Sequence, residues 1–337
     1  MWVVAPNAYL CDIGAMEPRL AVTGCAGFIG SNMVDYLLSQ GYEVIGFDNF
    51  STGKPQFIEK ALKNPNFKLI EFDLLHSKGL EELLLNCHRI YHFSANADVK
   101  NGPKHTDRDL MQNTVATYNV LEASKRAGVQ EFVFSSTGSV YGESSVIPTP
   151  ECAPFPIQTS LYGASKLAGE GLAQAYASAF DLKVWIFRFV SILGDRYSHG
   201  HVFDFMSRLY KDPCHLQVLG NGSQRKSYLN VSDCVQAIDI AISKTSDQVN
   251  IFNLGHEEYC DVKQSISWIL DELKLSPEVS FEKKERGWIG DNPFILLNTK
   301  KIMDLGWMPR YSIEQSIRDT VRFLVENSWL FSRSRYS

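Results

Sequence analysis

The sequence predicts an α/β fold, a doubly wound parallel sheet with a smaller C-terminal lobe. Short apolar runs alternate with longer segments of helical periodicity through the first half of the chain. Such repeated βα units build a parallel sheet with helices on both faces. A glycine-rich turn follows the first apolar run, at residues 24–30. After residue 190, glycine, proline and polar residues become frequent and the alternation ends, which indicates a second, less regular part.

Six short apolar runs are expected to form the strands of this sheet. They lie at residues 20–23, 44–47, 68–72, 89–93, 132–135 and 184–187. Apolar residues at helical spacing predict helices at 31–40, 110–127 and 162–180. Right-handed crossovers between parallel strands then give the doubly wound arrangement. In the second part, helices are expected at 202–210 and 262–273.

The chain length fits two domains. At about 100–200 residues for each domain, 337 residues suffice for a sheet domain and a lobe. Residues 1–15 are expected to be an N-terminal extension, because the first strand begins only after Pro18. The sheet domain is expected over 16–190 and the lobe over 191–337, with a strand near 250–254 that returns to the sheet.

Composition excludes several classes of protein. The chain has 33 Lys and Arg against 38 Asp and Glu, a net charge of −5, which gives no electrostatic basis for binding nucleic acid or a membrane surface. The longest apolar stretch, near 184–190, contains Arg188 and is far shorter than the ~20 residues of a membrane span. The seven cysteines are scattered singly, so we expect free thiols, no metal site and a cytoplasmic location.

The turn after the first strand has the spacing of a phosphate-binding turn. Gly24, Gly27 and Gly30 follow the strand, with Phe28 and Ile29 between the last two glycines and the next helix expected from residue 31. Glycines at such positions allow a tight turn and close approach of the backbone to a pyrophosphate, which the helix N-terminus also favours. For the glycines alone, an ordinary glycine-rich turn is an equal alternative.

An acidic residue strengthens the dinucleotide interpretation. Asp48 ends the second strand, 18 residues after Gly30, close to the ~20 expected for an acid that binds a ribose 2′-hydroxyl. A carboxylate there would repel a 2′-phosphate, so NAD is favoured over NADP. Asp73 and Leu74 end the third strand and could bracket the adenine, with a plain turn as the alternative.

Two further segments carry groups suited to proton transfer. Tyr162 and Lys166 stand at i and i+4 of a predicted helix and so share one face. An ammonium and an oxidised nicotinamide both favour a phenolate, so we expect them to lower the pKa of Tyr162. Ser135 and Thr137 end the fifth strand, at the edge where doubly wound folds bind ligands. Taken alone, a solvated helix face and a polar strand end are the simpler alternatives.

Together these motifs resemble those of a known family. The set TGxxGxxG, Asp48, SSTxxVYG and YxxxK resembles the extended short-chain dehydrogenase/reductase superfamily, and within it the nucleotide-sugar epimerase/dehydratase family, over residues 19–325. The resemblance implies a Rossmann domain with tightly held NAD and a lobe that binds a nucleotide sugar. It also implies a homodimer built on the helices at 110–127 and 162–180.

The resemblance assigns roles to individual residues. The catalytic residues it implies are Thr137, Tyr162 and Lys166. Those that would contact NAD are Gly24, Gly27, Phe28, Ile29, Gly30, Asp48, Asn49, Ser51, Thr52, Gly53, Asp73, Leu74, Phe93, Ser94, Ala95, Asn113, Ser135, Tyr162 and Lys166. Those that would contact the nucleotide sugar are Thr137, Ser191, His201, Val202, Arg225, Lys226 and Arg286.

Departures from the family pattern bear on the reaction. The dehydratases carry an acid pair directly after the Ser/Thr, and the decarboxylases a glutamate where Ser139 stands, whereas this chain has Gly138 and Ser139. The expected reaction is therefore inversion at C4 of a UDP-hexose or UDP-hexuronate through a 4-keto intermediate. Another nucleotide-sugar dehydrogenase or dehydratase, or a non-catalytic NAD-binding regulatory protein, remains the alternative. Ser191 replaces a usual asparagine and Lys226 a usual arginine.

Overall fold

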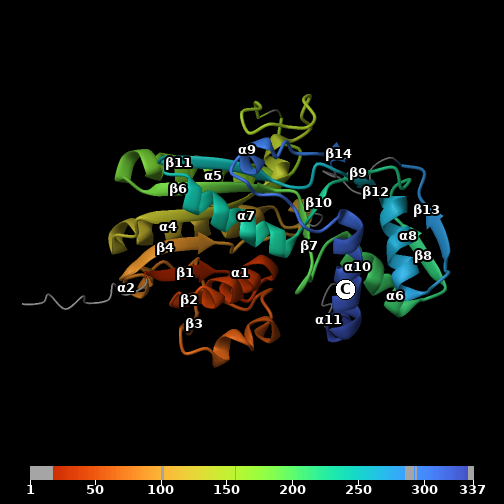
Figure 1. The fold of residues 1–337 in the computed structure, drawn as a ribbon, viewed down its shortest axis with the longest axis horizontal. Helices are drawn as coiled ribbons and strands as arrows, with labels where there is room; N and C mark the ends of the chain where they lie inside the picture. The colour runs from red at the N-terminus through yellow and green to blue at the C-terminus, as the bar shows by residue number, and fades with distance from the viewer. Residues whose placement is uncertain (1–17, 100–101, 156, 285–291, 293, 333–337) are drawn as a thin grey trace, which may run out of the picture.

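The computed structural model describes residues 18–99, 102–155, 157–284, 292 and 294–332. A seven-stranded parallel sheet forms its centre (Figure 1), in the order β11-β6-β5-β4-β1-β2-β3. The strands are β1 (Arg19–Thr23), β2 (Val44–Asp48), β3 (Phe67–Glu71), β4 (Cys87–His92), β5 (Glu131–Thr137), β6 (Lys183–Phe189) and β11 (Val249–Leu254). The order reverses between β1 and β4, and ligands of doubly wound sheets bind at such a point. The predicted fold class is confirmed.

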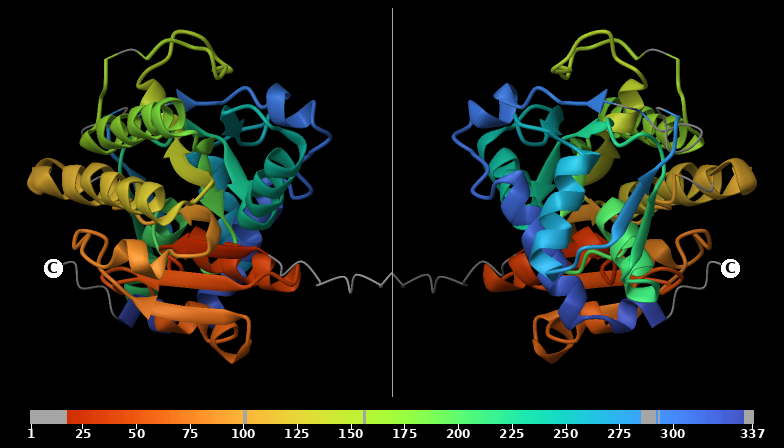
Figure 2. Two further views of the ribbon diagram at one scale, coloured as in Figure 1. Left: turned by 90° about the vertical axis from the view of Figure 1, so that its left-hand side faces the viewer. Right: turned by 90° about the vertical axis from the view of Figure 1, so that its right-hand side faces the viewer.

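Helices cover both faces of this sheet, as Figure 2 shows. One face packs against α1 (Phe28–Ser39) and α7 (Val231–Lys244), and the other against α2 (Leu80–Leu83), α4 (Ala116–Ala127) and α5 (Leu161–Phe180). Central strands are buried on both sides, as in β2, whose five residues are all buried. This explains why the strands are continuous apolar runs and not alternating ones.

The second part of the chain forms smaller sheets and three longer helices beside the main sheet (Figure 1). The helices are α6 (His201–Lys211), α8 (Val262–Leu273) and α10 (Ile313–Glu326), followed by α11 (Trp329–Ser332). The strand pairs are β7 (Ser191–Leu193) with β10 (Tyr228–Asn230), and β8 (His215–Val218) with β13 (Glu278–Phe281). A third sheet joins β9 (Arg225–Lys226) to β12 (Cys260–Asp261) and β14 (Phe294–Ile295).

The elements differ from the expectation in three places. The helix expected at 110–127 consists of a π-helical turn η4 (Leu110–Val115) and α4, and a short helix α3 (Thr106–Asp109) precedes it. Helix α7 lies beyond residue 190 but packs on α1 of the main sheet. The small sheets were not predicted, because two- to four-residue strands carry too little pattern to identify.

Short helical turns complete the connections. They are η1 (Pro55–Ile58), η2 (Ala61–Lys63), η3 (Gly102–Lys104), η5 (Gly138–Tyr141) and α9 (Lys300–Met303). Among the helices of the described residues, none has the length and apolar character needed to cross a membrane. The extension expected at 1–15 lies outside the described residues.

Candidate active site

The glycine-rich turn joins β1 to α1 at the carboxyl edge of the sheet. Gly24 has φ +68°, and a Cβ there would lie 2.8 Å from the backbone nitrogen of Ser94. A Cβ on Gly30 would overlap the carbonyl oxygen of Gly24. Only glycine fits either position, so the turn packs tightly on itself and on the loop after β4. Phe28 is buried against Tyr197, with their ring centroids 5.5 Å apart.

The same turn presents a helix N-terminus to that crevice. Within the described ranges, no side chain caps α1 at Gly27, and its first turn holds no acidic residue. The amide groups and partial positive charge at this end suit a phosphate group. The tightly packed glycine turn and the uncapped start of α1 together fit the pyrophosphate of a dinucleotide.

Asp48 ends β2 beside the turn. Its carboxylate accepts hydrogen bonds from the backbone N–H groups of Ala26, at 3.0 Å, and Phe50, at 2.8 Å. Burial raises the pKa of this carboxyl, and the backbone N–H bonds oppose the rise. A Cβ on Gly53 would lie 2.6 Å from the Asp48 Oδ1, so glycine makes room for the carboxylate. Its remaining lone pairs suit the two hydroxyls of a ribose.

The neighbouring residues form turns around Asp48. The Asn49 side chain accepts hydrogen bonds from the backbone and hydroxyl of Ser51, and Thr52 is exposed. Asp73 Oδ1 accepts from the backbone of Leu75, 2.9 Å away, after the end of β3. This is the turn geometry that was the alternative for Asp73, and Leu74 beside it is buried.

Tyr162, Lys166 and Thr137 meet where β5 ends against α5. The hydroxyl of Thr137 hydrogen-bonds Tyr162 and also lies 3.3 Å from the hydroxyl of Ser139. Lys166 is 1% exposed, and its Nζ lies 3.4 Å from the Ser135 hydroxyl and 4.4 Å from the Phe134 ring centroid. The strand and the helix thus bring together the two segments that the sequence singles out separately.

The pKa values of this pair depart from expectation in the protein alone. Burial raises the pKa of Tyr162 to about 12, and a hydrogen bond from Thr137 opposes the rise. Burial lowers the pKa of Lys166 to about 7, while Glu170 raises it. The expected lowering of the phenol pKa by Lys166 is therefore not found in the protein alone: burial disfavours the charged phenolate, and the opposing influence comes from Thr137.

A chain of hydrogen bonds behind the site connects the glycine turn to α4. His92 is fully buried at the end of β4, with Nδ1 2.8 Å from the Thr23 hydroxyl and Nε2 3.0 Å from the Thr117 hydroxyl. The Thr117 hydroxyl donates its one hydrogen to the Asn113 carbonyl, so it accepts from His92. His92 therefore carries its proton on Nε2, and burial lowers its pKa to about 3.

The predicted cofactor loop after β4 is held by this chain. The backbone N–H of Ser94 lies 3.3 Å from the Thr23 hydroxyl, and Phe93 and Ala95 flank it, half-buried. Asn113 is fully buried, and its side chain forms hydrogen bonds with the backbone of Asn96. It therefore acts on the site through the residues that it bonds.

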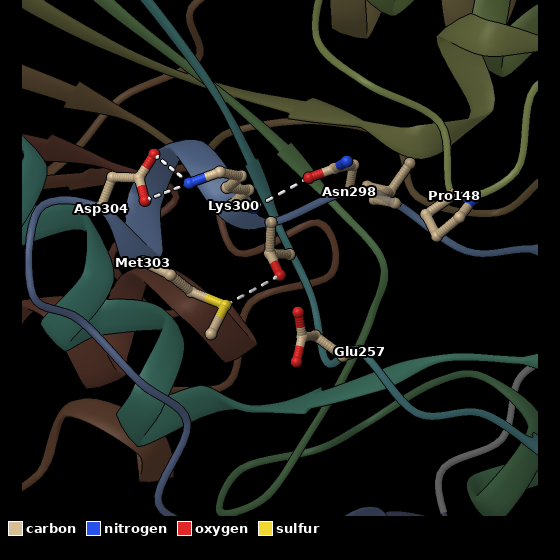
Figure 3. A pocket seen from close by; sticks show the side chains of 8 residues that line it. Pro148, Glu257, Asn298, Lys300, Met303 and Asp304 are labelled. Atoms are coloured by element: carbon tan, nitrogen blue, oxygen red, sulfur yellow. Dashed lines mark hydrogen bonds and ion pairs between the residues drawn. The ribbon is translucent and has the colours of Figure 1, made fainter.

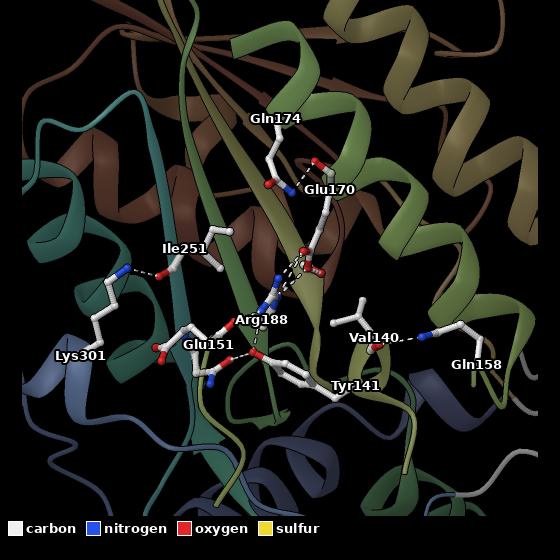
Figure 4. A network of polar contacts seen from close by, with 11 residues as sticks. Val140, Tyr141, Glu151, Gln158, Glu170, Gln174, Arg188, Ile251 and Lys301 are labelled. Atoms are coloured by element: carbon white, nitrogen blue, oxygen red, sulfur yellow. Dashed lines mark hydrogen bonds and ion pairs between the residues drawn. The ribbon is translucent and has the colours of Figure 1, made fainter. Parts of the chain in front are cut away.

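A second polar network lies under the end of β5 (Figure 4). The carboxylate of Glu170 pairs with the guanidinium of Arg188 and accepts from the hydroxyl of Ser136. Arg188 also donates to the Tyr141 hydroxyl at 2.6 Å, and that hydroxyl donates to Asn253 at 2.9 Å. These residues lie beneath the site, and the sequence does not single them out, because only tertiary packing brings Glu170, Arg188 and Tyr141 together.

The candidates for the nucleotide sugar are spread over the lobe. Arg225 and Lys226 are neighbours on β9, so their side chains leave opposite faces of the sheet. The Arg225 guanidinium lies 4.2 Å from the Phe294 ring centroid and 5.4 Å from that of Tyr259. Lys226 Nζ donates to the carbonyl of Asn292 at 2.7 Å. The two cations therefore do not converge on one diphosphate, and Lys226 is the one left as a candidate.

Three further candidates lie around α6. His201 begins that helix, with Nε2 2.8 Å from the Ser265 hydroxyl and its ring stacked on Tyr228 at 4.7 Å. The side chain of Val202 is in the core, so only its backbone can reach a ligand. Ser191 begins β7 and is exposed. Arg286 lies outside the described residues.

A cavity of about 490 Å³ lies apart from these residues (Figure 3). Its lining includes none of the predicted site residues; it consists of Pro148, Glu257, Leu297, Asn298, Thr299, Lys300, Met303 and Asp304. The Lys300 ammonium pairs with Asp304 at its rim. Of the charged groups that line it, Lys300 and Asp304 pair with each other and Glu257 is exposed. The cavity therefore does not bring charged side chains together around a common point, as an active site would.

Comparisons with known proteins agree with this geometry. The profile of the NAD-dependent epimerase/dehydratase family matches residues 20–255. The UDP-glucose 4-epimerase of Mycolicibacterium smegmatis is 30% identical over 92% of this chain and 99% of its own. UDP-glucuronic acid decarboxylase 1 of Arabidopsis thaliana is 32% identical over 82% of this chain and 67% of its own.

A solved structure gives the same result. The UDP-glucuronic acid 4-epimerase of Bacillus cereus, in complex with UDP-glucuronic acid and NAD, superposes with a TM-score of 0.82. It is 27% identical over 92% of this chain and 99% of its own. A family profile that covers residues 20–255, together with an epimerase relative matched over 99% of its own length, goes beyond similarity of fold. The chain belongs to the NAD-dependent epimerase/dehydratase family, whose cofactor is NAD.

Proposed function

We propose that the protein is a nucleotide-sugar 4-epimerase that inverts C4 of a UDP-hexose or UDP-hexuronate through a 4-keto intermediate. The observation that carries this proposal is the assembly of Thr137, Tyr162 and Lys166 at the carboxyl edge of β5. On the turn η5 that follows, the side chain that bonds this set is Ser139. This set supports removal and return of hydrogen at one carbon, and it supplies no acid pair for loss of water.

The proposed chemistry uses one proton-transfer group twice. Bound NAD would supply the acceptor, and then the donor, of the hydrogen at C4. Tyr162 takes the proton of the 4-hydroxyl through its phenolic oxygen, so that a carbonyl forms at C4. Thr137 hydrogen-bonds the same substrate oxygen. After the ketone has turned in the pocket, Tyr162 gives the proton back, which restores the hydroxyl with inverted configuration.

Lys166 supports this step electrostatically. With a pKa of about 7, it is largely cationic in weakly acidic solution, and an oxidised nicotinamide would add a second positive charge near the phenol. Both charges favour the phenolate, against a burial that raises the pKa of Tyr162 to about 12. The proposed base therefore becomes competent only when cofactor and lysine are both in place.

The proposed cofactor site uses the turn and the two strand ends beside it. The pyrophosphate is proposed to lie on Gly24, Gly27, Phe28, Ile29 and Gly30, where α1 begins without a side-chain cap. Asp48 would bind the adenosine ribose, and the segment around it would close over that ribose. Thr52, Leu74 and Ala95 would line the cofactor, and Asn113 would position the nicotinamide side through its side-chain hydrogen bonds to the backbone of Asn96.

The proposed nucleotide-sugar site faces this turn from the lobe. Lys226, His201 and Ser191 are proposed to contact the nucleotide sugar, and Val202 through its backbone. Because lysine offers a point charge and no bidentate fork, Lys226 would hold the diphosphate less rigidly than an arginine.

A product analysis tests this proposal. The purified protein is incubated with UDP-glucose, UDP-galactose, UDP-glucuronate and the N-acetylated hexoses, and the nucleotide sugars are separated. A C4-inverted product from at least one of them is expected, and inversion of none would overturn the proposal. Tyr162→Phe should retain NAD and lose turnover. Tyr210→Phe changes an exposed tyrosine in the same way and should be fully active.

A decarboxylase is the second candidate, favoured by the 32% identity to a UDP-glucuronic acid decarboxylase. Ser139 argues against a decarboxylase, because the decarboxylases of this family carry a glutamate at this position. Release of carbon dioxide from UDP-glucuronate, with a UDP-pentose as product, would select this candidate. Retention of six carbons in the product would exclude it.

We also propose a homodimer formed through α4 and α5. The preceding turn η4 exposes Leu110 and Met111, α4 exposes Tyr118, and α5 adds small exposed residues such as Ala164 and Ala168. Small residues let a second helix pair approach closely, and apolar patches of this kind mark interfaces. A monomer mass in light scattering would refute it, and Ala168→Glu should convert a dimer to monomer.

A further inference from the structure

A buried carboxylate with one unpaired oxygen lies beside the reacting residues. Asp109 ends α3 and is 1% exposed. Its Oδ1 accepts hydrogen bonds from the side-chain amides of Asn96, at 2.8 Å, and Asn113, at 3.4 Å. Its Oδ2 has no hydrogen-bond partner among the residues that the structure describes. A buried polar atom is normally paired, so this exception calls for an explanation.

The space opposite this oxygen is kept open by a glycine. A Cβ on Gly102 would lie 3.1 Å from Asp109 Oδ2 and 3.9 Å from the Cβ of Leu161. Leu161 is the first residue of α5 and directly precedes Tyr162. Asp109 is therefore buried between the loop after β4 and the start of the helix that carries the proposed base.

The two amides bound by Asp109 join these same segments. Asn113 Oδ1 accepts from the backbone N–H of Asn96 at 2.7 Å, and Asn113 Nδ2 lies 3.0 Å from the Ser165 hydroxyl. That hydroxyl donates to the backbone carbonyl of Tyr162 at 2.8 Å. Asn113 lies in the π-helical turn, a distortion that is frequent at functional sites.

The charge of Asp109 also acts on the proposed base. Burial is the main cause that raises the pKa of Tyr162, and the negative charge of Asp109 adds to it. Burial raises the pKa of Asp109 itself; Asp98 adds to this rise and Arg108 opposes it. On α5, Lys166 is the cation one turn beyond Tyr162. The carboxylate thus has both a positional and an electrostatic link to the reacting site.

We propose that Asp109 is a positioning residue of the reacting site: it clasps the side chains of Asn96 and Asn113 and so holds the loop after β4 against the start of α5. Its role in turnover rests on the proposed function. The clasp itself does not, because it concerns contacts within the protein alone.

Hydrogen exchange tests the clasp without an activity assay. In holoenzyme with Asp109→Ala, amides of residues 94–99 should exchange about tenfold faster than in the wild type, because the side chain that orders Asn96 and Asn113 is lost. Asp107→Asn is the matched control, since Asp107 is exposed on the same short helix. It should exchange like the wild type. Equal exchange in the Ala variant and the wild type would overturn the proposal whatever the activity.

The pH profile tests the link to the base. Asp109→Asn keeps an oxygen for the Asn96 amide and removes the charge, so the acid limb of kcat should move to lower pH by about half a unit. Asp109→Ala should lower kcat about tenfold with the KM of the UDP-sugar changed less than about twofold. A superimposable profile, or an equal shift in Asp107→Asn, would refute the electrostatic link. A wild type that inverts no UDP-sugar would overturn the proposed function and leave the exchange result to decide the clasp.

Discussion

The carboxylate of Glu170 and the guanidinium of Arg188 form an ion pair sealed from solvent, with Nη2 2.7 Å from Oε2. Their side chains are 0% and 2% exposed. Glu170 lies one turn beyond Lys166 on α5, and Arg188 is near the end of β6. The pair therefore ties the helix that carries the proposed base to the strand beside it.

Breaking this pair on one side should be costly. Glu170→Gln leaves the Arg188 charge buried without a counter-charge, so we expect a loss of about 3–5 kcal/mol of unfolding free energy. The double variant Glu170→Leu/Arg188→Met should recover part of that loss, because no charge is left buried. Urea unfolding measures both. Asp304→Ala, which breaks an exposed pair with Lys300, is the control and should leave the midpoint unchanged. A small effect of Glu170→Gln would contradict the sealed pair.

Adding a single methyl group to the glycine-rich turn should cause a loss of bound NAD. Gly30→Ala places a Cβ against the Gly24 carbonyl, which disturbs the close packing of α1 on the turn. The NAD content of the purified protein should fall below about a tenth of the wild-type value. Gly171→Ala is the matched control, because that position on α5 has open space around it. Its NAD content should equal that of the wild type; normal NAD in Gly30→Ala would count against the proposed pyrophosphate site.

Removal of the Thr137 hydroxyl should shift the pH dependence of kcat in a defined direction. Its hydrogen bond lowers the pKa of Tyr162, so its removal in Thr137→Val should raise that pKa. A base with a higher pKa is active only at higher pH, and the acid limb of kcat should move upward by about one unit. Thr137→Ser keeps the hydroxyl and should keep the wild-type profile. If both variants have the wild-type profile, Thr137 does not act on Tyr162.

His92 predicts a pH dependence of stability. Its native pKa of about 3 lies below the ordinary value, so its contribution is complete above pH ~6.5 and is lost as the pH falls toward 3. In this window the unfolded chain binds one proton more than the native chain, which costs about 1.4 kcal/mol per pH unit. His92→Gln should remove this slope in urea unfolding between pH 6 and 4.5. His215→Gln, at an exposed site, should keep it. An unchanged slope in His92→Gln would show that this histidine takes up its proton in the native state.

Continuous apolar runs predicted the sheet because its central strands, such as β2, are buried on both faces. The runs at 20–23 and 44–47 fall within β1 and β2, and the helix expected at 162–180 is α5 with one residue added. These inferences depend on patterns that extend over whole elements. That Thr137 and Tyr162 belong to one site was implied only by the family resemblance, which names both as catalytic residues.

The polar groups behind the site could not be predicted in the same way. Asp109, Glu170 and Arg188 have the residue types of a solvated surface, and only tertiary packing buries them. The stacking of Arg225 on Phe294 depends on strands of two residues brought together from distant parts of the chain. Such contacts have no local sequence signal, so the candidate cations of the lobe could not be separated in advance.

The central claim is that a single carbon is oxidised and then reduced within one site. We would incubate the wild-type holoenzyme with UDP-glucose carrying deuterium at C4, in ordinary water, and analyse the separated nucleotide sugars by mass spectrometry and proton NMR. The account predicts UDP-galactose that retains the deuterium at C4, because the hydrogen leaves and returns without meeting solvent; for a hexuronate-specific enzyme the same label in UDP-glucuronate gives the same result. A C4-inverted product that has lost the label, or the lack of inversion with either labelled sugar, would contradict it.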